Sequence, residues 1–100
     1  MKKRIAIPTQ KGKLSKGIQQ DTTFNIFEIE DEKVVRVEQT VPDIITTNYT
    51  SLWLYYKRVT MLYIEEINHD LKNKLKRLGI IVKSRDELTE DKFFNSFVFD

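Results

Sequence analysis

The chain has 100 residues, of which 40% are hydrophobic and 32% charged, with a formal net charge of +2 and no cysteine. This size and balance indicate one globular domain over residues 1–100, and the lack of cysteine excludes disulfides, thiolate nucleophiles and metal sites built from the chain's own thiolates. The basic start leads into an apolar run that ends at Pro8, too short for an export signal or a membrane span, so we expect a cytoplasmic protein.

The first half of the chain predicts three strands. Residues 4–8 form a short strand with Ile5 and Ile7 on one side, and a polar loop over residues 9–22 follows it. Two further runs, residues 24–29 and 34–37, are rich in β-branched and aromatic residues, and the acidic pair between them predicts a hairpin.

A helix is expected next, beginning near Thr47 or Asn48, since either residue is a good cap. Four large side chains follow the i, i+3, i+4, i+7 spacing of a buried helix face: Tyr49, Leu52, Trp53 and Tyr56. If this face packs on the core, Leu54 and Tyr55 point away from it, toward solvent or a partner.

The remaining elements alternate. Residues 59–64 are almost continuously apolar, as in a strand covered on both faces, and residues 80–82 form the last strand. Between them a helix from about Asn68 to Leu78 ends at Gly79. Residues 84–87 have capping-box spacing and open a final helix. That helix would bury Leu88, Phe93, Phe94 and Phe97.

This order of elements predicts an α/β fold. Strands joined through helices pair in parallel by right-handed crossovers, whereas the hairpin pairs in antiparallel fashion. We therefore expect three layers around a mixed five-stranded sheet of order 3-2-1-4-5, with strand 2 antiparallel. Ligands of such sheets bind at the carboxyl ends of the strands beside the switch in strand order, here residues 9–20 and 65–69.

Several short motifs carry a family resemblance. Residues 5–9 read IAIPT, residues 12–15 read GKLS, and Leu75 precedes Gly79-Ile80 by the spacing seen before the last strand of the family. Over most of its length the chain resembles the dinitrogenase iron–molybdenum cofactor biosynthesis proteins, which include NifX-like accessory proteins. The resemblance implies a ribonuclease-H-like fold and, for some members, binding of an iron–molybdenum cluster or its precursor.

The chain departs from the family where a cluster would bind. The family's histidine, aromatic residue and glycine correspond to residues 17–19, and its glycine-rich turn corresponds to residues 65–68, which read EEIN. Two glutamates repel an anionic cluster and lack the backbone access that glycine gives. We expect a non-catalytic interaction module with a degenerate pocket and no cofactor. The alternative is a carrier for a metal cluster or another anionic cofactor. Its candidate pocket residues are Thr9, Lys13, Ser15, Gly17 and Asn68.

The acidic residues and the single histidine also bear on divalent-metal chemistry. A two-metal nuclease needs an acid on the first strand, where this chain has Arg4. Glu66, His69 and Asp70 could share one face of a helix start and hold a divalent cation. The favoured alternative is an exposed first turn capped by Asn68.

The expected partner is another protein or a second copy of the chain. The surface would be the aromatic helix or the phenylalanine-rich residues 93–99. Nucleic acid is not expected, because the aromatic residues are not interleaved with the basic N-terminal residues, and no membrane contact is expected.

Overall fold

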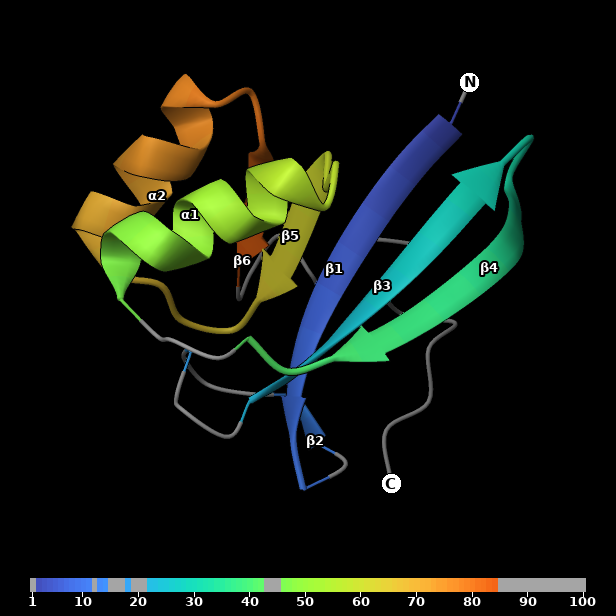
Figure 1. The fold of residues 1–100 in the computed structure, drawn as a ribbon, viewed down its shortest axis with the longest axis horizontal. Helices are drawn as coiled ribbons and strands as arrows, with labels where there is room; N and C mark the ends of the chain where they lie inside the picture. Colours follow the sequence, from blue (N-terminus) through green and yellow to red (C-terminus); the bar gives the residue numbers. More distant parts are fainter. Residues whose placement is uncertain (1, 12, 15–17, 19–21, 43–45, 85–100) are drawn as a thin grey trace.

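The computed structural model describes residues 2–11, 13–14, 18, 22–42 and 46–84. These residues form one mixed sheet with two helices packed on it (Figure 1). The elements are β1 (Lys2–Gln10), β2 (Lys13–Leu14), β3 (Thr23–Glu30), β4 (Lys33–Thr40), α1 (Thr47–Tyr56), β5 (Met61–Ile64), α2 (His69–Arg77) and β6 (Ile81–Ser84).

The strand order is β4-β3-β1-β5-β6. The β3 strand is antiparallel to both of its neighbours, whereas β1, β5 and β6 are parallel. The predicted order 3-2-1-4-5, with strand 2 antiparallel, is therefore confirmed. The two-residue β2 was not predicted, because residues 9–22 were interpreted as loop; β2 pairs with the end of β1, joining Thr9 to Leu14 and Gln10 to Lys13.

The predicted hairpin between β3 and β4 is also confirmed. Asp31 and Glu32 have φ angles of 52° and 65°, so the two-residue turn has the left-handed geometry that matches the twist of antiparallel strands. A bulge between Glu28 and Ile29 shifts the register of the pair. This bulge increases the local twist of the hairpin.

Both helices lie side by side on one face of the sheet, over β5 and β6, while the β3–β4 hairpin extends beyond them (Figure 1). Leu54 of α1 and Leu71 and Leu75 of α2 are buried there against β1, β3 and β5. On the other face a second cluster is buried. It consists of Ile5, Ile7, Phe27, Ile29 and Tyr63. Since both faces of the central strands are buried, the sheet has the apolar character expected of a middle layer.

The predicted final helix, with Leu88, Phe93, Phe94 and Phe97, lies outside the described residues, as do residues 93–99. Helices on both faces of the sheet therefore stay a prediction for that segment. No helix in the described part of the chain has the length and apolar content needed to span a bilayer.

The face of α1 that packs on the sheet differs from the predicted one. The buried residues are Thr50, Ser51 and Leu54, whereas Leu52 and Tyr56 are 59% and 81% exposed. Of the predicted face, Trp53 packs partly into the core against Phe24, with ring centroids 5.1 Å apart. Small side chains let a helix approach a sheet closely, so α1 buries its Thr–Ser side and leaves its larger side chains outside.

The start of α1 is also shifted by one residue. Its cap is Thr46, whose side-chain oxygen accepts a hydrogen bond from the Tyr49 N–H at 3.1 Å. Thr47 was predicted as a possible cap, but it is the first helical residue. In α2 the predicted Asn68 cap and the ending at Gly79 are both confirmed, and the helix buries Leu71 and Leu75.

Candidate functional site

The parallel pairing of β1 with β5 brings Thr9 and the turn after Ile64 to the same edge of the sheet. This is the carboxyl edge where the sequence predicts a ligand site. Thr9 and Asn68 there already hold hydrogen bonds within the protein.

Asn68 closes the turn by capping α2. Its side-chain oxygen accepts a hydrogen bond from the Leu71 N–H at 2.7 Å. Asp70 follows in the first turn, where the positive end of the helix dipole stabilises its negative charge. The helix N-terminus is therefore occupied by the chain's own polar groups, and Glu65 and Glu66 precede it.

Replacing Asn68 with alanine is expected to lower the free energy of unfolding by about 1 kcal/mol, because the Leu71 N–H loses its acceptor. Thermal or urea unfolding measures the change. Asn73→Ala, on the exposed side of the same helix, is the control and should be neutral or slightly stabilising, because alanine favours the helix interior. Equal losses in the two variants would mean that Asn68 contributes no cap.

The cation site suggested for Glu66, His69 and Asp70 is not formed. Among the described residues, no group of three His, Asp or Glu side chains is arranged to hold a metal ion. The prediction assumed that Glu66 begins the helix, but the helix begins at His69, so the helical spacing does not apply to Glu66. Asp70 instead pairs with Lys74, at 3.6 Å, one turn further along.

Thr9 lies at the end of β1 in a chain of polar side chains. Its hydroxyl accepts a hydrogen bond from the Asn25 side-chain amide at 2.9 Å, and the same amide donates to the Ile7 carbonyl at 3.0 Å. Gln39 of β4 donates to the Asn25 side-chain oxygen at 2.8 Å. Asn25 is only 4% exposed, so these hydrogen-bonded side chains fill the interior of the carboxyl edge.

Sequence reasoning missed Asn25, although a signal was present: an amide in the otherwise apolar run Phe24–Phe27 needs a partner wherever it is buried. Of the other candidate pocket residues, Lys13 lies in β2, which pairs with β1, and Ser15 and Gly17 lie outside the described residues.

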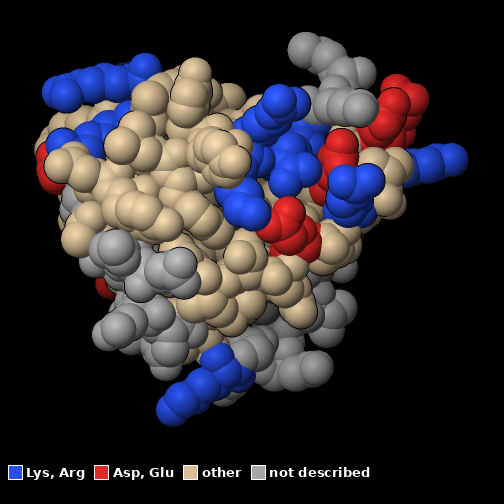
Figure 2. Space-filling view, viewed as in Figure 1, with Lys and Arg blue, Asp and Glu red and all other residues tan. Residues whose placement is uncertain are grey.

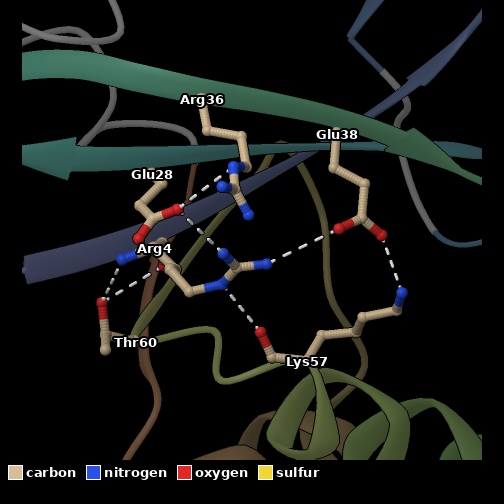
Figure 3. Close-up of polar contacts among 6 residues, drawn as sticks. All are labelled: Arg4, Glu28, Arg36, Glu38, Lys57 and Thr60. Atoms are coloured by element: carbon tan, nitrogen blue, oxygen red, sulfur yellow. Dashed lines mark hydrogen bonds and ion pairs between the residues drawn. The ribbon is translucent and has the colours of Figure 1, made fainter.

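The opposite, amino edge of the sheet holds a cluster of charges around Arg4, which we call the Arg4 cluster (Figure 3). The Arg4 guanidinium lies 3.6 Å from the Glu28 carboxylate and 3.7 Å from that of Glu38, and its Nε donates to the Lys57 carbonyl at 2.8 Å. The Lys57 ammonium in turn lies 2.7 Å from Glu38. The cluster therefore joins β1 and the β3–β4 hairpin to the end of α1.

Beside this cluster a groove of 810 Å³ opens between the ends of α1 and α2. We call it the amino-edge groove. Val59 and Thr60 complete its lining, which is formed mainly by Leu52, Tyr55, Tyr56, Arg58, Leu78 and Gly79. Viewed from the helix side, a broad area without charged side chains covers this part of the molecule, with lysine and arginine at its margins (Figure 2).

The two helix ends that shape the groove have the same backbone motif. Val59 and Ile80 each donate an N–H to a carbonyl five residues back, at 3.0 Å and 2.9 Å. The motif needs a left-handed residue, which is Gly79 after α2 but Arg58, with φ of 60°, after α1. A left-handed arginine costs about 1–2 kcal/mol relative to glycine. The left-handed backbone places the Arg58 side chain at the groove.

No protein-family model and no curated protein matches the chain. Solved structures that share its fold include the following two. The crystal structure of PH0822 has a TM-score of 0.74 and 21% identity, covering 81% of this chain and 75% of that one. The second is MJ0327 from Methanocaldococcus jannaschii, a protein provisionally named a dinitrogenase. It has a TM-score of 0.69 and 15% identity, covering 96% of this chain and 91% of that one.

The chain thus has the α/β fold of these two proteins. The fold that the resemblance implied is supported by MJ0327, whose likeness covers nearly the whole chain. A shared fold leaves the activity to be argued from the sites themselves.

Proposed function

We propose that the chain is a non-catalytic interaction module that binds an acidic, partly apolar segment of another protein in its amino-edge groove. The observation that carries this proposal is the exposure of Leu52, Tyr55 and Tyr56 around one groove, at 59%, 57% and 81%. Exposed apolar patches with a polar rim mark protein-binding surfaces. Tyrosine is also among the residues that contribute most to such interfaces.

The chemistry of the partner follows from the rim. Arg58 lines the groove, and the last turn of α2, which leads to Leu78 of the lining, is basic, with Lys74, Lys76 and Arg77. Lys74 also pairs with Asp70. An acidic side chain next to leucine or an aromatic residue would satisfy both the rim and the groove. Full burial of one large apolar side chain contributes about 1.5–3 kcal/mol, so two or three such contacts contribute about 3–9 kcal/mol before the entropic costs of association are subtracted.

The carboxyl edge favours this proposal over the cofactor carrier. Glu65 and Glu66 lie where an anionic cluster would approach, and the Asn68 side-chain oxygen is committed to the Leu71 N–H. A full charge nearby outweighs the roughly half charge of a helix end. On this proposal the chain keeps the α/β fold, but the pocket at the carboxyl edge of its sheet binds no cofactor.

The test is selection from a random peptide library displayed on phage, with the purified wild-type chain as bait. We expect enriched peptides that combine aspartate or glutamate with leucine, isoleucine or aromatic residues. Synthetic copies should bind Tyr56→Ser or Arg58→Glu at least about tenfold more weakly than the wild type, as expected for loss of one strong contact.

The matched control is Ile81→Ser, which alters a side chain that is 56% exposed but does not line the groove. It should bind the peptides like the wild type. Peptides without acids, or binding that Tyr56→Ser leaves unchanged, would contradict the proposal. So would stoichiometric metal and a visible chromophore after anaerobic incubation with molybdate, iron and sulfide, an outcome that would favour the carrier.

A further inference from the structure

The β4 strand forms one edge of the sheet. It runs over Lys33–Thr40, and within the described residues it pairs only with β3. Edge strands offer unpaired N–H and C=O groups to any other strand, and natural proteins usually keep them short or charged. At eight residues, β4 is long for a strand that pairs on one side only in the described part of the chain.

Three of the side chains of β4 are apolar and exposed. Val34, Val35 and Val37 are 47%, 55% and 53% exposed. The amino-edge groove does not account for them, because none of the three lines it. Three half-exposed valines on a free edge favour the addition of another strand.

The charges on β4 make the strand complementary to itself. Arg36 lies opposite Glu28 and Glu38 lies opposite Ile26, so both point to the helix side of the sheet, whereas Val37, opposite Phe27, points to the other side. Pairing two copies in antiparallel fashion about a two-fold axis perpendicular to the sheet sets same-side residues opposite each other.

The charges then select one register. With the axis at Val37, the valine meets its own copy, and Arg36 of each protomer meets Glu38 of the other, twice. An axis at Arg36 or at Glu38 would instead set like charges opposite each other, which is destabilising.

The groups needed for this pairing are accessible. Arg36 is 73% exposed in its side chain, and its only ion pair among the described residues is a long one of 3.8 Å to Glu28. Glu38 is 35% exposed and already contacts Lys57 and Arg4. An ionised carboxylate has about four lone-pair sites and can accept a further bidentate partner.

We infer that the chain forms a symmetric homodimer in which β4 pairs with β4 of a second copy, joining the two sheets into one with the axis at Val37. This surface is separate from the groove and does not depend on the proposed function. It also differs from the aromatic helix and the phenylalanine-rich end that the sequence suggested.

A single-cysteine series tests the register directly, since the chain has no cysteine of its own. Under mild oxidation, Val37→Cys should form a disulfide-linked dimer, because facing residues of an antiparallel pair have Cβ atoms about 4.5–5.5 Å apart. Ile81→Cys, on the other edge strand, and Tyr56→Cys, in the groove, should cross-link at least about tenfold more slowly, because their thiols meet only by random collision.

Sedimentation of the uncross-linked protein provides the second readout. The wild type should dimerise with rising concentration, and Val37→Lys, which sets two ammonium groups face to face, should weaken the dimer about tenfold or more at unchanged thermal stability of the monomer. Tyr56→Ser should leave dimerisation unchanged even if it abolishes peptide binding. A wild type that stays monomeric at high micromolar concentration, or faster cross-linking of Tyr56→Cys than of Val37→Cys, would overturn the inference.

Discussion

Replacing Leu54 with alanine is expected to lower the free energy of unfolding by about 2–5 kcal/mol. Leu54 is fully buried, at 0% exposure, and belongs to the same cluster as Leu62 of β5 and Leu75 of α2. Truncation removes its apolar contacts and leaves a cavity that the surrounding sheet can fill only in part. Because a domain of this size has only about 5–15 kcal/mol of stability, the loss should be plain in a urea titration or a thermal melt.

The control is Leu52→Ala, two positions away on the same helix. Leu52 is 59% exposed, so its truncation should change stability by no more than about 0.5 kcal/mol. The pair decides which side of α1 faces the sheet, since the aromatic spacing in the sequence predicts the opposite ranking. A larger loss for Leu52→Ala than for Leu54→Ala would mean that the face predicted from the sequence is the buried one. The side chains of α1 that line the groove would then not be exposed.

Arg4→Ala is expected to cost about 1.5–3 kcal/mol, the range for hydrogen bonds that involve charged groups. The Arg4 side chain is 19% exposed and Glu28 is 16% exposed, so removal of the guanidinium leaves two carboxylates close together and partly shielded from water. It also leaves the Lys57 carbonyl at the end of α1 without its donor. The measurement is equilibrium unfolding at low protein concentration, with the same change repeated as Arg4→Lys.

Lysine at this position keeps the charge but cannot contact both glutamates and the carbonyl with one planar group, so Arg4→Lys should recover only part of the loss. Arg36→Ala is the matched control. Its side chain is 73% exposed and its pair with Glu28 is long, so it should cost less than about 1 kcal/mol. If Arg4→Ala and Arg36→Ala are equally mild, the Arg4 cluster is a set of solvated surface charges.

Local chemistry in the sequence was a reliable guide to several elements. Asn68 before an apolar-periodic run, with Gly79 after it, identified α2 with its cap and its end. The acidic pair at residues 31–32 between two apolar runs identified the β3–β4 hairpin. From the alternation of strands and helices, the order of the sheet followed through the handedness of crossovers, and the structure has that order.

The candidate site was predicted less well, and the reason differs from residue to residue. The carboxyl edge was located correctly, but the partners of Thr9 come from β3, and Asn25 was not considered because its burial depends on strand pairing. The grouping of Glu66 with His69 and Asp70 assumed helical spacing, but α2 begins at His69, so Glu66 lies before the helix. The amino-edge groove was missed altogether, because its lining comes from the ends of two helices that are distant in sequence.

The sequence by itself therefore determined the main strands, the two described helices, the cap of α2 and the topology of the sheet, since these depend on neighbouring residues and on the handedness of the chain. The tertiary structure alone decided which side of α1 is buried and where Arg4 finds its partners. Periodicity gives the angles between side chains on a helix but not the rotation of the helix against the sheet. That rotation is set by which side chains fit the space, and at α1 the small Thr50 and Ser51 fit where Tyr56 does not.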